Sequence, residues 1–463
     1  MPFSSLLFIH LFLPAFLVAY YASPRAAKNY VAIGASLVFY AWGAPRFLPV
    51  VVALGVIDFV ISHQLARTRR KLLLAAGVTM HLSVLVYFKY SNFFVGELDA
   101  LLAHGGISPL TWTPVVLPIG VSFITFEEIS YLTDVYRGDA RPARKLSHYL
   151  LFLTLFPHSI AGPIFRWKDL EAQLAERVHS WQLAREGFER FAVGLAKKVL
   201  VADSVALIAD GVFGMPADQL TPGLAWAGAC AYALQIYFDF SGYSDMAIGL
   251  GKMIGFRFKE NFDRPYISAS ITEFWTRWHI SLSTWLRDYL YIPLGGNRRG
   301  RRRALLNLMI VFTLSGLWHG AAWTFVLWGA FHGAFVMCER LLGKRRDAVP
   351  RVIQHIATLV IVVIGWVFFR AGTAGHAFDV LAAMFGRVGD AIGPPTADYA
   401  PHFAQFAFVA GAVIVLAPIA TKYRAWRPRL PLAVVTAAGL LAFAGSAIHL
   451  TNMRITPLIY FKF

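Results

Sequence analysis

The chain has 463 residues, of which 57% are hydrophobic and only 15% are charged. Soluble domains average about 45–50% apolar and about 25% charged residues, so this balance argues against a soluble protein and favours many membrane-spanning helices. The net charge of +17 does not indicate nucleic acid, because Lys and Arg cluster in the short segments between apolar stretches, as in cytoplasmic loops. Two cysteines in apolar stretches provide neither a disulfide framework nor a zinc-thiolate site.

Apolar stretches recur along the whole chain. They cover residues 3–21, 30–62, 72–90, 112–136, 148–165, 188–212, 222–256, 304–340, 352–370, 403–420 and 431–450. We therefore expect an all-α polytopic membrane protein with about 10 to 12 transmembrane helices plus re-entrant or interfacial helices. Gly43-Ala-Pro45 interrupts the second stretch, which predicts two short helices or a bent hairpin. The first stretch has no basic residue before Arg25, which favours a retained span over a cleaved signal peptide.

The distribution of Lys and Arg predicts on which side each loop lies. The strongly basic segments are expected in the cytoplasm, and they are residues 67–71, 137–145, 298–303, 344–346 and 422–429. The loops near 91–111, 213–221 and 373–402 contain few basic residues and are expected on the opposite side, with Gly393-Pro-Pro395 in an external loop.

Two regions are too polar to be simple spans. Residues 166–190 have a helical pattern of charges that predicts a solvated or interfacial helix pair. Residues 257–303 mix aromatic and basic side chains, so they must lie in the membrane interface or re-enter a cavity lined by protein. We expect one membrane-embedded domain over 1–463, with N-terminal spans in 1–111, a catalytic core in 112–343 and C-terminal spans in 344–463.

His319 is an ionisable residue within the apolar stretch 304–340. Both flanks of this stretch are basic, so both ends belong on the cytoplasmic side, and its natural break is Gly316 to Gly320. We expect a hairpin of two short helices with His319 near its apex. An ionisable group at membrane depth is costly, and it is retained either for chemistry or because it has a polar partner such as a backbone carbonyl.

A helix is predicted to begin at Thr272, with Glu273 in its first turn. Helical spacing would place four side chains on one face, and these are Trp275, His279, Ser283 and Arg287. Anchoring in the membrane interface explains aromatic residues such as Trp285 and Tyr289. A His and an Arg on one line of the helix favour contact with an anionic or acyl-carrying substrate.

Carboxylates also occur at membrane depth, in the apolar stretch 222–256. Asp239 and Tyr243 are one helical turn apart, and Asp245 follows. Buried carboxylates need partners, and two interpretations are open. They either form ion pairs or line a polar tunnel and position the reactive histidines; the candidate ion-pair partners are Arg277, Arg287 and Arg257.

Further polar groups interrupt apolar helices at Phe126-Glu-Glu128 and at His158. Each of these is a weak signal by itself. No two histidines have the spacing of metal ligands, so we expect no metal site.

Several long motifs, in a fixed order along the chain, resemble those of a known family. They are Phe274 to Tyr289, Tyr291 to Arg298, Leu317-Trp-His-Gly-Ala321, Tyr237 to Asp245, Ile160-Ala-Gly-Pro163 and the final Ile459-Tyr-Phe-Lys-Phe463. Together they resemble the membrane-bound O-acyltransferases, and among these the bacterial branch that contains alginate O-acetyltransferases. The resemblance covers nearly the whole chain. Glu127 and His158 depart from the residues that it leads us to expect.

The resemblance implies a tunnel through the helix bundle, with His319 as the catalytic histidine and His279 as the second member of the catalytic pair. Eight further side chains are candidates for lining this tunnel: Asp239, Tyr243, Asp245, Trp275, Arg277, Ser283, Arg287 and Trp318. His319 would act as general base on a hydroxyl, which is a weak nucleophile at neutral pH. His279 would orient the acceptor or the thioester carbonyl.

The implied reaction moves an acetyl group from a cytoplasmic thioester to hydroxyls of a secreted, alginate-like polysaccharide, in the inner membrane of a bacterium. We expect acetyl-CoA or an acyl carrier as the donor and no bound cofactor. The acetyl group would pass directly or through a periplasmic partner such as an SGNH-type acetyltransferase. The bases of Arg298 to Arg303 would attract donor phosphates or anchor lipid headgroups. Membrane lipids are expected partners, and nucleic acid is not.

The sequence is also compatible with three alternatives. One is transfer of D-alanyl or another acyl group to a cell-wall polymer. Another is a transporter, in which intramembrane Asp, Glu and His residues form a relay, although such proteins usually carry internal repeats and none is visible here. The third is a scaffold of a secretion complex without activity of its own.

Overall fold

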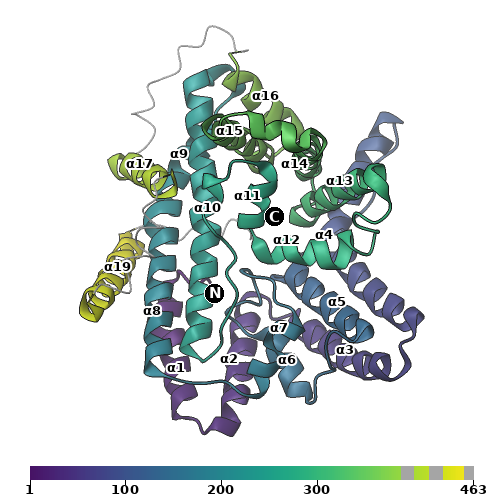
Figure 1. Ribbon diagram of the computed structural model, residues 1–463, viewed down its shortest axis with the longest axis vertical. Helices are drawn as coiled ribbons and strands as arrows, with labels where there is room; N and C mark the ends of the chain where they lie inside the picture. The colour runs from purple at the N-terminus through teal and green to yellow at the C-terminus, as the bar shows by residue number, and fades with distance from the viewer. Residues whose placement is uncertain (387–400, 417–430, 453–463) are drawn as a thin grey trace. The chain divides into compact units, whose positions relative to one another are not determined.

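The computed structural model describes residues 1–386, 401–416 and 431–452. Within these residues every regular element is helical (Figure 1), and five helices are long and apolar enough to cross a membrane. They are Leu48–Thr68, Lys71–His104, Trp323–Ala348, Arg351–Arg370 and Leu432–Thr451. The predicted all-α, multi-pass fold is confirmed, while the expected total of spans stays a prediction.

Some of the sequence features lie outside the described residues. They are the basic segment 422–429, the loop segment 393–395 and the terminal motif 459–463.

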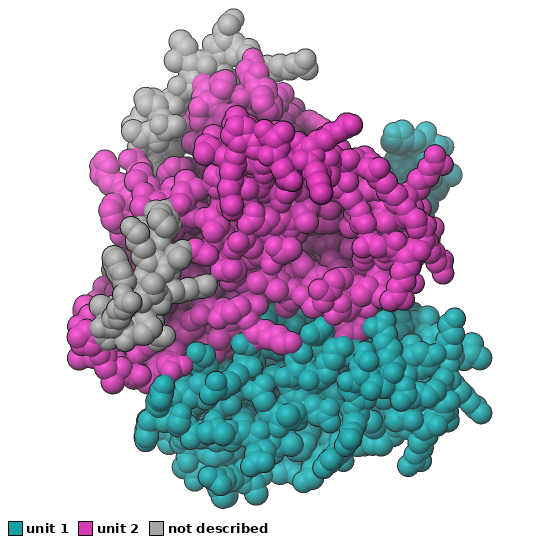
Figure 2. Space-filling model, viewed as in Figure 1, with its two compact units in different colours: residues 1–184, 251–258 teal, residues 185–250, 259–463 magenta. Residues whose placement is uncertain are grey.

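The chain divides into two compact units (Figure 2). Unit 1 contains residues 1–184 and 251–258, and unit 2 contains residues 185–250 and 259–463. Both predicted catalytic histidines and all eight candidate tunnel residues therefore fall in unit 2. The expectation of a single domain over the whole chain stays a prediction.

Unit 1 is a group of helices with polar side chains at its centre. Its helices are η1 (Phe8–Phe12), α1 (Leu13–Ala22), η2 (Arg25–Ala27), α2 (Lys28–Gly43), α3 (Leu48–Thr68), α4 (Lys71–His104), α5 (Val121–Arg137), α6 (Leu146–Thr154) and α7 (Trp167–Ala175). The predicted break near Pro45 is confirmed, since α2 ends at Gly43 and α3 begins at Leu48.

The charge pattern predicts a loop near 91–111, and this prediction is wrong for most of these residues. Helix α4 continues to His104 and ends at Gly105. Residues 91–104 contain no proline, and the single Gly96 does not end a helix by itself. Only the segment after Gly105 is a loop.

Unit 2 holds the elements that carry the predicted motifs. They are α8 (Trp181–Ala196, which begins in unit 1), η3 (Lys197–Ala202), α9 (Asp203–Phe213), η4 (Ala217–Gln219), α10 (Pro222–Met253), η5 (Pro265–Ile267), α11 (Ile271–Arg277), α12 (Ile280–Leu286), η6 (Arg287–Tyr291), α13 (Gly300–His319), α14 (Trp323–Leu342), η7 (Gly343–Ala348), α15 (Arg351–Arg370), α16 (Ala374–Met384), α17 (His402–Leu416) and α19 (Leu432–Asn452). Helices α7 and α8 confirm the helix pair predicted within 166–190.

The stretch 304–340 forms the predicted hairpin, from α13 and α14. Each helix has 20 residues, so neither is short. The two pack at close range through glycine, because a Cβ on Gly316 would lie 2.1 Å from the Phe325 carbonyl oxygen and one on Gly329 would lie 2.3 Å from that of Phe312. Small residues at such crossings let helix backbones approach in a membrane.

The single helix predicted from Thr272 to Arg287 is wrong. Helix α11 ends at Arg277, and His279 adopts a left-handed conformation with φ 44° before α12 begins at Ile280. Such a conformation is uncommon outside glycine and needs support from the surrounding structure. Trp275, His279, Ser283 and Arg287 therefore do not form one helix face.

Candidate active site

His319 is the last residue of α13, at the turn of the hairpin. Only 5% of its surface is exposed. Its ring is surrounded by three aromatic rings, whose centroids lie 4.9 Å (Trp318), 5.2 Å (Trp328) and 5.3 Å (Phe369) from its own. The hairpin and α15 thus surround the imidazole with aromatic rings, where polar interactions are less screened than in water.

His279 lies at the break between α11 and α12 and is buried. Its Nδ1 lies 3.1 Å from the amide oxygen of Asn261. That oxygen also accepts hydrogen bonds from the backbone N–H of Ser281 at 3.2 Å and its hydroxyl at 2.9 Å, while the Asn261 amide nitrogen donates to Ser244. Because the Ser281 backbone N–H can only donate, the Asn261 atom that faces it must be the amide oxygen. His279 Nδ1 faces the same oxygen, so in a neutral His279 it carries the proton and Nε2 is the acceptor.

Both histidines contact the ring of Trp318. The Trp318 ring centroid lies 6.4 Å from that of His279 and 4.9 Å from that of His319. Residues 40 positions apart in sequence thus contact one indole ring. In Figure 2 the visible face of unit 2 is hollowed in the region that α11, α12, α13 and α14 surround in Figure 1.

The carboxylates of α10 have ion-pair partners, but not the arginines that the sequence suggested. Asp245 accepts hydrogen bonds from Arg190 at 2.7 Å and from Lys197 at 2.6 Å. Asp239 lies 2.6 Å from the ammonium of Lys198. These cations belong to α8 and the π-helix η3, whose wider turn presents Lys197 and Lys198 to α10. Tyr243, one turn after Asp239, is buried.

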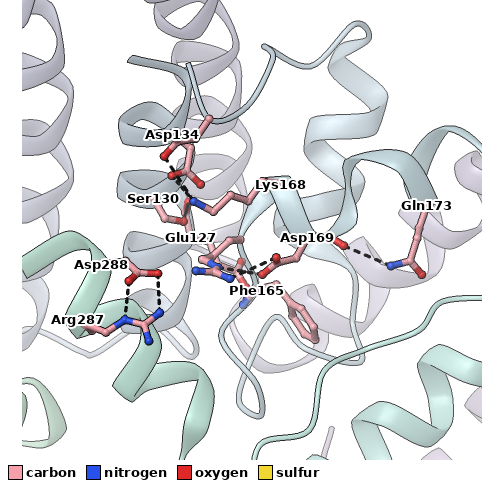
Figure 3. Close-up of polar contacts among 11 residues, drawn as sticks. Glu127, Ser130, Asp134, Phe165, Lys168, Asp169, Gln173, Arg287 and Asp288 are labelled. Atoms are coloured by element: carbon pink, nitrogen blue, oxygen red, sulfur yellow. Dashed lines mark hydrogen bonds and ion pairs between the residues drawn. The ribbon is translucent and has the colours of Figure 1, made fainter. Parts of the chain in front are cut away.

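The remaining candidate side chains are spread over the surface and the core. Arg277 bonds to Glu273 and Asp263 rather than to Asp239 or Asp245. Arg287 is 61% exposed and pairs with the neighbouring Asp288 (Figure 3). The Ser283 hydroxyl donates to the backbone carbonyl of Trp275 at 3.0 Å, which ties α12 to α11.

Unit 1 contains a buried polar network that the sequence indicated only in part. His81 lies between two carboxylates, with Nε2 2.8 Å from Asp58 and Nδ1 2.8 Å from Glu128. Tyr149 donates to the other oxygen of Asp58 at 2.8 Å. Asp58 and His81 could have been found in the sequence by the same criterion as Glu128, because each is an ionisable residue in an apolar stretch.

In this network the His81–Asp58 contact is a hydrogen bond, while His81 and Glu128 lie at ion-pair distance without hydrogen-bond geometry. Asp58, His81 and Glu128 are close enough to share an ion, but each carboxylate faces a different nitrogen of the imidazole. A chelated ion needs its ligand atoms to converge on one point. The neighbouring Glu127 lies 3.1 Å from His158 Nδ1, so the two positions that depart from the family pattern contact each other. Elsewhere in unit 1, Lys168 reaches the carboxylate of Asp134 (Figure 3).

Comparison with known proteins assigns the chain to a family. Residues 144–373 match the model of the membrane-bound O-acyltransferase family. The probable alginate O-acetylase of Azotobacter vinelandii is 50% identical over 393 residues, which cover 83% of this chain and 78% of the relative. The chain belongs to the membrane-bound O-acyltransferase family. Within this family it is an O-acyltransferase by class, and the matched region contains both His279 and His319.

Other relatives in the family differ in their named substrates. The peptidoglycan O-acetyltransferase of Helicobacter pylori is 34% identical over 427 residues, covering 84% of this chain and 80% of the relative. The teichoic acid D-alanyltransferase of Bacillus subtilis is 28% identical over 240 residues, covering 49% of this chain and 60% of the relative.

Proposed function

We propose that this chain transfers acetyl groups from a cytoplasmic thioester to hydroxyls of an alginate-like exopolysaccharide, in the inner membrane of a bacterium. The observation that carries the proposal is the 50% identity to a probable alginate O-acetylase over 83% of the chain. The more distant relatives, a peptidoglycan O-acetyltransferase and a D-alanyltransferase, make cell-wall polymers and D-alanyl donors the alternatives to be tested.

His319 is proposed as the general base. The hydroxyl oxygen of the acceptor attacks the thioester carbonyl carbon, the new ester bond forms, and the carbon–sulfur bond breaks. The imidazole takes the hydroxyl proton and passes it to the departing thiolate, so that the products are an ester and a thiol. General-base assistance of this kind contributes roughly 10²- to 10⁴-fold to the rate.

His279 is proposed to orient one reactant against His319. Support comes from its burial, its contact with Trp318 and the hydrogen bond between Nδ1 and Asn261. In this proposal Nε2 is the atom that orients the reactant. Trp318 contacts both rings. The tunnel that would join donor and acceptor sides belongs to this proposal.

The experiment is acetyl transfer by the purified full chain in proteoliposomes. Labelled acetyl-CoA is the donor and polymannuronate oligosaccharide the acceptor. We expect His319→Ala to reduce the rate by at least about 100-fold, in line with the contribution of a general base. Near wild-type turnover by His319→Ala would rule out the assigned base. If peptidoglycan fragments were labelled and polymannuronate were not, the acceptor would be peptidoglycan rather than an alginate-like polysaccharide.

The same assay separates direct transfer from relay. If the chain acts alone, the oligosaccharide is labelled without any added partner protein. If the acetyl group passes through a periplasmic SGNH-type acetyltransferase, label reaches the oligosaccharide only when that protein is added. A D-alanyl-loaded carrier protein in place of acetyl-CoA tests the alternative donor.

A further inference from the structure

We propose that His332, Trp328 and Trp275 form an oxygen-binding site beside His319 that holds the acyl carbonyl during transfer. The inference rests on the acyl transfer proposed above and adds a residue, His332, that the proposed mechanism does not use. All three side chains belong to unit 2, from α11 and α14.

The three rings contact one another pairwise. The His332 ring centroid lies 5.0 Å from that of Trp275 and 5.2 Å from that of Trp328, and the two indoles lie 5.5 Å apart. Trp328 also contacts His319 at 5.2 Å. The cluster therefore contacts the proposed general base through Trp328, and this one ring lies between His332 and His319.

The cluster contains buried polar atoms whose bonding is incomplete. His332 is fully buried and Trp328 nearly so, while Trp275 is half-buried. Within the described residues, the indole nitrogens of Trp275 and Trp328 and both ring nitrogens of His332 have no hydrogen-bond partner. Buried polar groups in native proteins are rarely left so, and a cluster of them points to a bound ligand or to water.

Glycine on a neighbouring helix makes room for the imidazole. A Cβ on Gly365 of α15 would lie 2.4 Å from His332 Nε2. The ring therefore fills a space that a larger residue at position 365 would occupy. An imidazole in this buried space costs free energy unless it has a polar partner, whereas an apolar ring would not.

The chemistry of the donors identifies the kind of ligand. An indole N–H donates and cannot accept, and a neutral imidazole donates from one nitrogen. A site built from such groups takes an oxygen acceptor. In acyl transfer from a thioester, the carbonyl oxygen gains negative charge when the hydroxyl adds to the carbon, and loses it when the carbon–sulfur bond breaks. Fixed donors in a water-poor site stabilise that charge.

Two other arrangements would give these nitrogens hydrogen-bond partners without a role in acyl transfer, namely contacts with ring faces and an internal water molecule. The rings meet edge to face, with interplanar angles of 70° to 87°, so the N–H groups could point at ring faces, which is a weaker interaction. A buried water could instead bond to several of them. In both arrangements, removing the nitrogens would leave the rate of acyl transfer unchanged.

The test compares turnover with donor binding in the full chain. His332→Phe keeps the ring and removes both nitrogens, and Trp328→Phe keeps a ring and removes the N–H. We expect each to lower kcat for acetyl transfer by roughly 10²- to 10³-fold, as for loss of one oxyanion donor. Affinity for S-ethyl-coenzyme A, a donor analogue without a carbonyl oxygen, should change less than about threefold. His332→Gln, which restores a donor, should recover part of kcat.

Trp226→Phe is the matched control, because the Trp226 indole lies outside the cluster and donates to the Met384 carbonyl at 3.0 Å. This variant should keep the wild-type kcat. Turnover by both His332→Phe and Trp328→Phe near that of wild type would mean a water or ring contacts only, and overturn the proposal. A parallel loss of kcat and of S-ethyl-coenzyme A affinity would mean packing only, and overturn it too. A wild-type chain that moves no acetyl group would instead contradict the proposed function.

Discussion

At the scale of single residues, the site depends on how each imidazole is held. His319 is held by aromatic rings on three sides, whereas His279 is held by a hydrogen bond in a left-handed turn. A turn of this kind persists only where the surrounding contacts determine it. Asn261 supplies those contacts, because its amide oxygen bonds to both His279 and Ser281.

We expect Asn261 to act as a positioning residue for His279. Asn261→Ala should lower kcat by at least about tenfold, or roughly 1.4 kcal/mol of transition-state stabilisation, because His279 loses the acceptor that assigns its tautomer. Asn261→Asp keeps an oxygen acceptor and should recover much of the rate. Equal losses in both variants, measured as kcat and KM for acetyl transfer, would show that the oxygen does not position His279.

At the scale of elements, close helix packing creates the apex that carries His319. Helices α13 and α14 approach through Gly316 and Gly329, where any side chain would meet a backbone carbonyl of the other helix. A backbone atom cannot move aside as a flexible side chain can. This close approach of the two helices therefore requires glycine at both positions.

Gly316→Ala should accordingly reduce both folding yield and acetyl transfer, since the added Cβ would force the two helices apart near His319. The cost expected for overpacking is about 1–3 kcal/mol or more. Gly34→Ala in α2 is the control, because nothing lies within 4 Å of its Cβ position and alanine favours a helix. Thermal unfolding in detergent compares the two, and equal stability would contradict the prediction.

A buried network joins four helices of unit 1. Asp58 comes from α3, His81 from α4, Glu128 from α5 and Tyr149 from α6. Removing one member of a buried ionic group leaves the others without compensation. By contrast, replacing the whole group by apolar residues often costs little.

His81→Leu should therefore destabilise the protein by about 3–5 kcal/mol, since two buried carboxylates would face each other without the imidazole. The triple change Asp58→Leu, His81→Leu and Glu128→Leu should recover much of that loss. His63→Leu on α3, whose ring is partly exposed, should change stability by less than about 0.5 kcal/mol. An unfolding temperature of His81→Leu equal to that of His63→Leu would contradict this prediction.

At the scale of the whole molecule, we expect the basic segments to orient the helices in the membrane. The hairpin α13–α14 has basic residues at both ends, with Arg301–Arg303 in the first turn of α13 and Lys344–Arg346 just after α14. Because the two helices are antiparallel, both ends must lie on one side, and the positive charge predicts the cytoplasmic side.

Cysteine labelling tests this orientation. In a chain without Cys230 and Cys338, Arg302→Cys and Lys344→Cys should both react with a membrane-impermeant maleimide in inside-out vesicles. Ser108→Cys, in the loop after α4, should react only in right-side-out vesicles. Labelling of the two hairpin ends from opposite sides would show that α13 and α14 do not return to the same face.

The membrane class, the family and the hairpin around His319 can all be predicted from the amino-acid sequence. The composition and the length of the apolar stretches predict helices that lie in lipid. Basic residues on both flanks of a glycine-rich break predict that the chain reverses there. These are local properties, so periodicity and spacing record them. The same patterns placed one long helix from Thr272 to Arg287, because nothing local marks the turn at His279.

Contacts between side chains of different helices, by contrast, depend on the three-dimensional packing. Lys197 and Lys198, rather than Arg277 or Arg287, pair with Asp245 and Asp239, and Asn261 holds His279. Partners such as His81 and Asp58, or His332 and Trp275, lie on different helices. Whether two such residues touch depends on how helices cross and how closely glycine lets them approach, and no pattern within one helix contains that information.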